Sequence, residues 1–233
     1  MILRPFFTYF GGKWRNAPHY PVPKYGTIIE PFAGSAGYSL RYPERRIVLI
    51  EKSKAIAGIW DFLIRARESE ILALPLLKPG QSVDTLPVPQ EARWLIGMCI
   101  NPGSSQPKKT RGSWTGADYE NHHGMCTWSS QARARIARQV SHIRHWRILN
   151  ADYSVAADVP VTWYVDPPYR DLGRHYPHGS AAINFSALAT WCQSRRGQVI
   201  VCESAGADWL PFRFLGSMKA KTGVSREAIW TNA

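Results

Sequence analysis

Residues 27–51 read TIIEPFAGSAGYSLRYPERRIVLIE and decide the fold class. An apolar run over residues 27–31, stopped by its final proline, predicts a short buried strand. Small residues follow at 32–37, Tyr38–Tyr42 has the pattern of a helix start, and Ile47–Ile50 is a second apolar run. A strand, a turn, a helical segment and a second strand in this order favour a parallel α/β sheet.

The rest of the chain continues this alternation at both of its ends. Apolar side chains at helical spacing predict a helix over Ala55–Leu74. Val161–Val165 and Gln198–Cys202 are apolar runs that predict strands, and Ile183–Ser194 has the pattern of a helix. The sequence therefore predicts an α/β sheet built from the two ends of the chain.

The middle of the chain has a different composition. Residues 75–130 are rich in Pro, Gly, Ser, Asn and Trp, and only Gln90–Cys99 has a helical pattern there. Residues 101–114 form a long basic loop, a kind of segment that is usually functional or disordered. Residues 130–147 predict a basic helix, whose arginines either face solvent or contact phosphates.

Composition limits the class of protein. The 233 residues are 45% hydrophobic, enough for one domain with an inserted region. No run reaches the about 20 apolar residues of a membrane span, and the N-terminus lacks a signal-peptide pattern. Cys99, Cys126, Cys192 and Cys202 lack CxxC spacing, and His122 and His123 beside Cys126 lack the spacing of a zinc site. We expect an unprocessed protein of the reducing cytoplasm, without disulfides or metal.

Charge indicates the kind of partner. Lys and Arg number 29 against 17 Asp and Glu, which gives a net charge of +12. A sequence pI of about 9.8 is typical of proteins that bind polyanions. Charge alone does not separate nucleic acid from other polyanions.

The motif Asp166-Pro167-Pro168-Tyr169 comes directly after an apolar strand. Ligands of open α/β sheets bind beyond the carboxyl ends of strands. The two prolines restrict the backbone, so that a carboxylate and a carbonyl can both accept hydrogen bonds from one NH₂ group. A neighbouring aromatic ring can stack on a planar base. The motif therefore predicts a site for the exocyclic amine of a nucleobase.

Two further turns have small residues that allow a ligand close to the backbone. Glu30–Gly37 follows the first strand, and Glu51 ends the second, where an acid holds ribose hydroxyls in nucleotide-binding folds. Tyr9–Lys13 is a tight, aromatic and basic turn near the N-terminus.

These motifs, in this order and spacing, resemble those of the Dam-type (D12 class) DNA adenine N6-methyltransferases, phage-borne relatives in particular. The resemblance covers about residues 5–65 and 150–215, and the middle matches only in position. It implies a Rossmann-like sheet of the S-adenosylmethionine-dependent methyltransferases. Residues 1–65 and 148–233 would form the catalytic and cofactor-binding domain. Residues 66–147 would be an inserted, mostly helical and loop target-recognition region.

The resemblance implies a role for each matching residue. Asp166, Pro167, Pro168 and Tyr169 match the family's DPPY catalytic loop, and Phe32 would lie beside the methionine part of the cofactor. Glu51 matches the acid that binds the ribose, and Tyr153 follows Asp152 where the family has an Asp-Phe pair at the cofactor's adenine. The implied binding site for S-adenosylmethionine, and for S-adenosylhomocysteine as product, comprises Tyr9, Gly11, Gly12, Lys13, Glu30, Pro31, Phe32, Ala33, Gly34, Ser35, Gly37, Glu51, Lys52, Asp152 and Tyr153.

The chain departs from the family at three positions. Ala36 stands where many relatives have glycine, which puts the detail of the cofactor loop in doubt. Glu51 replaces the commoner Asp, and Tyr153 replaces Phe. The implied reaction needs none of the groups that these changes remove. An adenine flipped out of duplex DNA would stack on Tyr169, while Asp166 and the Pro167 carbonyl accept hydrogen bonds from N6 as it attacks the methyl group.

The expected partner is double-stranded DNA, bound by a monomer or a dimer. Trp114 and Tyr119 are candidate wedge or stacking residues. Residues 171–178 follow the catalytic loop and are expected to close over the flipped base. The candidate DNA contacts are Lys108, Lys109, Arg111, Arg133, Arg135, Arg138, Arg174, His175 and Tyr176.

Two alternatives remain at the level of the sequence. One is a methyltransferase that acts on another exocyclic amine, in RNA or on cytosine N4 or guanine N2. A glutamine side chain as acceptor is disfavoured, because related glutamine methyltransferases have Asn in place of Asp166. The other alternative is a DNA-binding regulator without catalysis, which would bind the cofactor without turnover.

Overall fold

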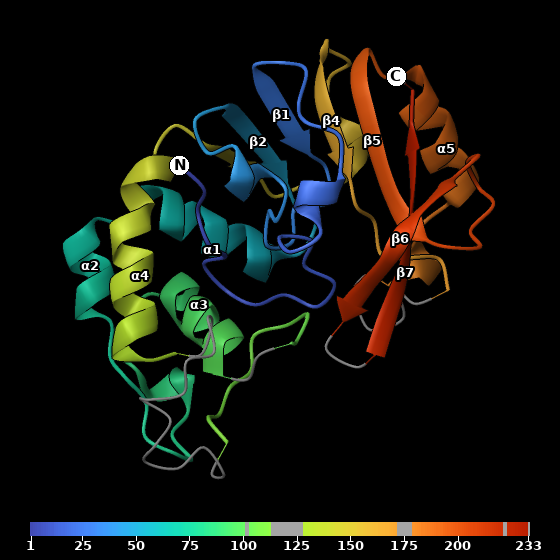
Figure 1. Ribbon diagram of the computed structural model, residues 1–233. Coiled ribbons are helices and arrows are strands. Elements are labelled where there is room, and N and C mark those ends of the chain that lie inside the picture. The colour runs from blue at the N-terminus through green and yellow to red at the C-terminus, as the bar shows by residue number, and fades with distance from the viewer. Residues whose placement is uncertain (101–102, 113–127, 172–178, 221–222, 233) are drawn as a thin grey trace.

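In the computed structural model of the chain, the strands of the described residues form one seven-stranded sheet (Figure 1). The structure describes the chain except for residues 101–102, 113–127, 172–178, 221–222 and 233. The strand order is β3-β2-β1-β4-β5-β7-β6. The strands are β1 (Thr27–Glu30), β2 (Arg46–Ile50), β3 (Arg147–Leu149), β4 (Val161–Val165), β5 (Gly197–Ser204), β6 (Arg213–Ala220) and β7 (Gly223–Thr231).

The expected Rossmann-like parallel sheet is confirmed. Strands β1 to β5 pair in parallel, and β7 lies antiparallel between β5 and β6. The chain builds outward from β1 to β2 and β3, and then returns to place β4 on the other side of β1. The carboxyl ends of β1 and β4 therefore meet at a switch point, where open sheets form their ligand crevice.

Helices cover both faces of the sheet (Figure 1). Ile28 of β1 packs in the cluster on the side of α1 to α4, whereas Ile29 packs in the cluster on the side of α5. Strand β4 is buried along its whole length, as expected for a central parallel strand. The helices are α1 (Lys54–Arg65), α2 (Glu68–Ala73), α3 (Gln90–Ile100), α4 (Ser130–Val140) and α5 (Phe185–Ser194).

The single helix predicted over Ala55–Leu74 is wrong, because the chain breaks between α1 and α2. Ala66 and Arg67 adopt extended backbone angles. The Glu70 carboxylate accepts a hydrogen bond from the Arg67 backbone N–H at 2.7 Å and starts the second helix. The guanidinium of Arg144 binds the carbonyls of Ile64 and Ala66 at the break.

The helix predicted over residues 130–147 is too long. It ends at Val140, a 3₁₀ turn spans Ser141–Ile143, and Arg147–Leu149 is the edge strand β3. The buried Trp146 donates its indole N–H to the carbonyl of Pro43 at 3.2 Å, which turns the chain onto the edge of β2. The helix start predicted at Tyr38–Tyr42 is only the 3₁₀ turn Ser39–Arg41.

The remaining predicted elements agree with the structure to within a few residues, but β6 and β7 were not predicted. Of the loop at 101–114, Asn101, Pro102, Ser113 and Trp114 lie outside the described residues. Apart from the bridge between Ser82 and Thr110 and the first residue of β3, the described part of 66–147 is helix and loop. Met98 and Ile136 join the same hydrophobic cluster as Trp60 of α1. The division into two domains stays a prediction.

None of the helices in the described parts of the chain combines the length and the apolar character that crossing a lipid bilayer requires.

Candidate functional site

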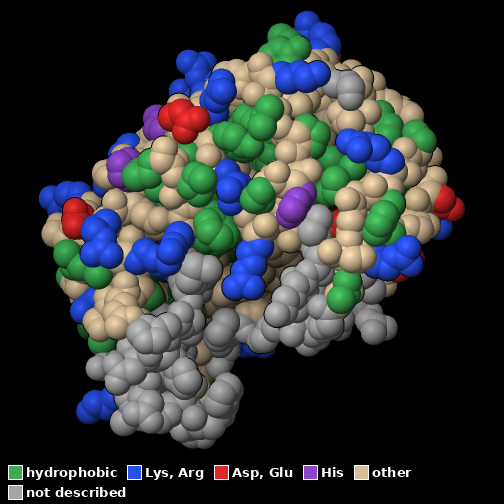
Figure 2. All heavy atoms as spheres, viewed as in Figure 1, with side chains coloured by type: hydrophobic (Ala, Val, Ile, Leu, Met, Phe, Trp, Pro, Cys, Tyr) green, Lys and Arg blue, Asp and Glu red, His purple; other side chains and the backbone are tan. Residues whose placement is uncertain are grey.

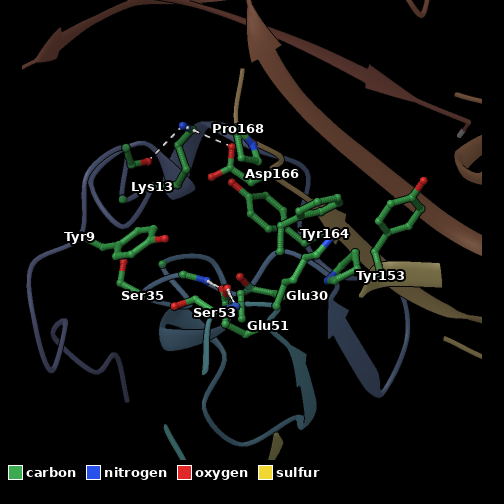
Figure 3. Close-up of a pocket in the computed structure, with 18 of the residues that line it drawn as sticks. Tyr9, Lys13, Glu30, Ser35, Glu51, Ser53, Tyr153, Tyr164, Asp166 and Pro168 are labelled. Carbon is green, nitrogen blue, oxygen red and sulfur yellow. Dashed lines mark hydrogen bonds and ion pairs between the residues drawn. The ribbon is translucent and has the colours of Figure 1, made fainter. Parts of the chain in front are cut away.

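A cavity of about 270 Å³ lies at the carboxyl ends of the central strands. Its walls come from the turn at residues 9–13, from the loops that follow β1, β2, β3 and β4, and from the segment that precedes α5 (Figure 3). Every residue that the resemblance assigns to the cofactor lines this cavity: Tyr9, Gly11, Gly12, Lys13, Glu30, Pro31, Phe32, Ala33, Gly34, Ser35, Gly37, Glu51, Lys52, Asp152 and Tyr153.

Glu51 joins two of these loops. Its carboxylate accepts hydrogen bonds from the backbone N–H of Gly34 at 3.0 Å and of Ser53 at 2.8 Å, one on each oxygen (Figure 3). Burial raises the pKa of Glu51, and these backbone hydrogen bonds oppose the rise. Because a carboxylate oxygen has two lone-pair sites, each oxygen keeps one further acceptor position for a ligand hydroxyl.

The loop after β1 is tightly held. Trp60 of α1 donates its indole N–H to the carbonyl of Gly34 at 2.8 Å. Ala36 has φ +50°, in the left-handed region that favours glycine, and its side chain is fully buried. The departure from glycine at Ala36 therefore leaves the left-handed turn in place, with an alanine in a conformation that costs alanine free energy.

Gly37 brings this loop against the N-terminal turn. A Cβ at Gly37 would lie 2.6 Å from the backbone nitrogen of Trp14 and 3.0 Å from backbone atoms of Lys13. We therefore expect Gly37→Ala to push residues 13–14 outward and to lower the free energy of unfolding by about 1–3 kcal/mol. Thermal denaturation measures the loss, at about 2–4 °C of Tm per kcal/mol.

Gly26→Ala is the matched control for Gly37→Ala, because no atom lies within 4 Å of a Cβ at Gly26. Equal melting temperatures for the two variants would contradict the close approach at Gly37.

Lys13 and Asp166 form an ion pair inside the cavity (Figure 3). Lys13 Nζ lies 3.3 Å from Asp166 Oδ1, and the two side chains are 7% and 18% exposed. The ammonium also donates to the carbonyl of Gly11 at 3.1 Å and lies 4.4 Å from the ring centroid of Tyr169. Burial raises the pKa of Asp166 to about 6; Lys13 opposes the rise, whereas Glu227 and Glu203 add to it.

Glu30 is a second buried carboxyl group of the cavity. It is 2% exposed and accepts a hydrogen bond from the backbone N–H of Ser39 at 2.7 Å. Burial raises its pKa to about 8, against hydrogen bonds from Ser39 and with the charge of Asp166 adding to the rise. The buried part of the lining thus combines three carboxyl groups, Glu30, Glu51 and Asp166, with the ammonium of Lys13.

One wall of the cavity is aromatic. The rings of Phe32 and Tyr153 stack with centroids 5.3 Å apart and an interplanar angle of 28°. Tyr153 also meets the edge of Trp191, and Asp152 pairs with Lys52 at 3.2 Å beside it. This wall offers flat apolar surface next to a polar pair, which suits a heteroaromatic ring with polar edges.

The catalytic loop predicted from the sequence only partly reaches the cavity. Asp166 and Pro168 line it, whereas Pro167 and Tyr169 are not among the lining residues. Tyr169 is 8% exposed. Its hydroxyl donates a hydrogen bond to Glu227 of β7, a strand that the sequence did not predict.

Several arginines predicted to contact DNA bind the protein itself. Arg133 and Arg135 of α4 donate to the carbonyls of Leu74 at 2.5 Å and of Pro5 at 2.7 Å. Arg111 donates to the carbonyl of Leu77. These guanidinium groups fasten distant segments of the chain together, a role that a helical-face pattern does not reveal.

The other predicted DNA contacts fall into two groups. Lys108 and Arg138 are exposed, and Lys109 is 81% exposed and pairs with Asp84 at 3.5 Å. Lys and Arg side chains are prominent over the face in Figure 2, where acidic ones are few. Arg174, His175 and Tyr176 lie outside the described residues, as do Trp114 and Tyr119 and most of the expected closing segment at 171–178.

Sequence reasoning missed six lining positions: Phe10, Ser53, Tyr164, Ala182, Ile183 and Asn184. Tyr164 lies two residues before Asp166 on β4, so the alternation of a strand would have indicated it. Asn184 caps α5 by accepting a hydrogen bond from the Ala187 N–H, and a cap before a predicted helix is a readable signal.

The comparisons with known proteins found no matching family model and no match among curated proteins. Solved structures do match. A "conserved hypothetical protein" of Streptococcus pyogenes has 12% identity and a TM-score of 0.35, and the match covers 89% of this chain and 86% of that one.

Two further matching structures are of proteins named as methyltransferases or methylases. For "Putative methyltransferase yhhF" of Escherichia coli, identity is 11%, the TM-score is 0.33, and coverage is 87% of this chain and 74% of that one. A "putative methylase" of Haemophilus influenzae has 9% identity and a TM-score of 0.33, and the match covers 93% of this chain and 82% of that one. At these TM-scores and identities, none of the three assigns an activity to the chain.

Proposed function

We propose that the chain transfers a methyl group from S-adenosylmethionine to the N6 amine of adenine at specific sites in double-stranded DNA. One observation carries the proposal. The carboxyl group of Asp166 and every residue that the Dam-type resemblance assigns to the cofactor surround one cavity, although they come from both ends of the chain. A turn, a ribose-binding acid and a DPPY loop that matched by chance would not be expected to converge in this way.

The residues of the cavity fit S-adenosylmethionine. Glycines bring backbone close to the space: a Cβ at Gly12 would lie 3.0 Å from Ser35 Oγ, and a Cβ at Gly34 would lie 3.0 Å from the Tyr9 ring. Asp166 Oδ1 is buried and has the ion pair with Lys13 but no hydrogen bond among the described residues. Glu51 accepts one hydrogen bond on each carboxylate oxygen and has lone pairs left for the ribose hydroxyls.

In the proposed methyl transfer, the residues of this chain act on the amine that accepts the methyl group. When bound, S-adenosylmethionine supplies a methyl group activated by the positive charge on sulfur. Asp166 would accept a hydrogen bond from the N6 amine of a flipped adenine and orient the amine's lone pair toward the donor. Its negative charge would also stabilise the positive charge that develops on N6. Pro167 and Pro168 hold this carboxylate in place, because their rings restrict the backbone of the loop.

Methyl transfer to unmethylated double-stranded DNA, followed by nucleoside analysis, tests the proposal. Labelled S-adenosylmethionine is incubated with the DNA and the purified chain. N6-methyladenine in the digest is the expected product, and sequencing of the modified positions then gives the target site. Labelled cytosine or guanine, label only in structured RNA, or cofactor binding without transfer to any of these, would each overturn it.

Salt dependence tests the contact with DNA. Lys108 and Lys109 are exposed on the basic segment, and each phosphate contact contributes about 0.9 to the slope of log affinity against log salt. Neutralising both, with Lys108→Gln and Lys109→Gln, is expected to flatten this slope by about 1.8. The measurement is fluorescence anisotropy of labelled duplex DNA between low and moderate salt.

Lys24→Gln is the control for the salt experiment. Lys24 is exposed but precedes β1, at the end of the strands away from the cavity. An unchanged slope in the Lys108 and Lys109 variant, or an equal change in the control, would remove this segment from the DNA contact.

A further inference from the structure

We infer that Glu227 is a positioning residue for the proposed methyl transfer, which acts by holding the ring of Tyr169 through its hydroxyl group. The inference rests on the proposed function and extends it to β7, a strand outside the sequence motifs. Glu227 pairs in register with Ser204 at the end of β5. It therefore lies where the sheet meets the loop that follows β4.

The contacts of Glu227 are unusual for a buried acid. Its side chain is 2% exposed. One carboxylate oxygen accepts a hydrogen bond from the Tyr169 hydroxyl, and the other accepts one from Ser225 Oγ at 2.7 Å. Among the described residues no ion pair involves Glu227. A buried carboxylate without a cation costs stability, and local features that cost stability are concentrated at functional sites.

The ring of Tyr169 is held at more than one point. Its hydroxyl is fixed by Glu227, and the ammonium of Lys13 lies 4.4 Å from the centre of the ring. The next residue, Arg170, donates its backbone N–H to Glu203 of β5 at 3.1 Å. Because the loop is tethered to β5 and β7, the plane of the Tyr169 ring is set before a base arrives. Such preorganisation favours the reactive geometry.

Glu227 also acts on Asp166 through its charge. The charged or titratable groups that interact with Asp166 are Lys13 of the N-terminal turn, Glu30 of β1, Glu203 of β5, Glu227 of β7, Tyr20, Tyr164, Tyr169 and Cys202. Burial and the two glutamates raise the pKa of Asp166, and Lys13 lowers it. A Glu227→Gln substitution separates the two effects, since its carbonyl can still accept from Tyr169 while its amide can donate to the Ser225 hydroxyl.

The test compares Tyr169→Phe, Glu227→Ala, Glu227→Gln and the double variant Tyr169→Phe/Glu227→Ala. We expect Tyr169→Phe and Glu227→Ala each to lower kcat by about 10- to 100-fold, the range for a hydrogen bond to a charged group. The Kd for the cofactor should stay within about twofold. The double variant should lose no more activity than either single variant, because both single substitutions remove the same hydrogen bond.

Glu227→Gln should recover kcat to within about threefold of the wild type and move the acid limb of the pH profile to lower pH.

A control removes structural hydrogen bonds at the opposite end of the β5–β7 pair. Asn232 donates to the carbonyl of Gly197 at 3.1 Å and accepts from the Val199 N–H at 2.9 Å, away from the cavity. Asn232→Ala should lower the melting temperature and leave kcat unchanged. Multiplicative losses in the double variant, or near-normal kcat in Glu227→Ala, would overturn the inference.

A second measurement does not depend on activity. With 3-fluorotyrosine at position 169, the ¹⁹F resonance should be single and sharp in the wild type and in Glu227→Gln, and shifted or broadened in Glu227→Ala. If the wild type transfers no methyl group to DNA, the proposed function fails while this spectrum still reports whether Glu227 holds the ring. Identical spectra for Glu227→Ala and the wild type would show that Glu227 does not fix the ring of Tyr169.

Discussion

Asp166→Ala is expected to lower methyl transfer by about 10³-fold or more while the cofactor still binds. The carboxylate lines the cavity and is the proposed acceptor for the N6 amine, and removing one preorganised electrostatic partner of a transition state costs about 10²–10³ in kcat. The substitution also frees Lys13, whose ammonium loses its ion pair at 3.3 Å. An uncompensated cation near the developing positive charge on N6 would lower the rate further. Single-turnover transfer to duplex DNA, with calorimetry of cofactor binding, measures both effects.

Two further variants test whether this loss of rate is specific to the carboxylate of Asp166. Asp166→Asn keeps an acceptor oxygen but removes the charge, so its rate should lie between those of the wild type and Asp166→Ala. Asp61→Ala removes a carboxylate on α1 whose single ion pair within the described parts of the chain is with Arg65, and should transfer at the normal rate. Near-normal turnover in Asp166→Ala would remove the residue from the catalytic role.

The sequence predicted the cavity well because each of its motifs directly follows an apolar strand. Glu30, Glu51 and Asp166 each lie at or just beyond the carboxyl end of β1, β2 or β4. Neighbouring parallel strands bring their carboxyl ends to one edge of the sheet, so three local patterns were enough to assemble one site. No long-range contact had to be guessed.

The sequence did not predict the parts that depend on tertiary contacts. Strand β7 has the charged pair Arg226-Glu227 in its middle, and β6 contains Gly216, so neither has the apolar run of a buried strand. Glu227 was missed with its strand. The break at Ala66 has neither Pro nor Gly, and it depends on Arg144, a residue far along the chain.

The contacts of the basic helix α4 also depend on tertiary structure. Ile136 and Val140, on its apolar face, are buried. The pattern could not indicate that Arg133 and Arg135 reach carbonyls of Leu74 and Pro5. A guanidinium group has five donors, so one bond to a carbonyl leaves others for a phosphate, and contact of these arginines with DNA stays a prediction.

Lys13→Met is expected to move the acid limb of the pH–rate profile upward. In the wild type, Asp166 has a pKa of about 6, so transfer should fall as the pH drops below about 6 and the carboxyl group takes up a proton. Lys13 lowers that pKa. Removing an ammonium at this distance should raise it by about 1–3 pH units, so the loss of rate relative to wild type is larger at pH 6.5 than at pH 9.

A variant that keeps the positive charge distinguishes loss of the charge of Lys13 from a general disturbance of the site. Lys13→Arg keeps the charge and should hold the acid limb within about one pH unit of the wild type, whatever it does to kcat. Lys13→Met should also weaken the cofactor, because the turn at residues 9–13 lines the cavity and the ammonium braces it against Gly11. A uniform loss of rate at every pH would mean that Lys13 supports the shape of the turn and does not control the protonation of Asp166. An upward shift in Lys13→Met alone would identify the ion pair as the device that keeps Asp166 ionised, and therefore able to accept a hydrogen bond, near neutral pH.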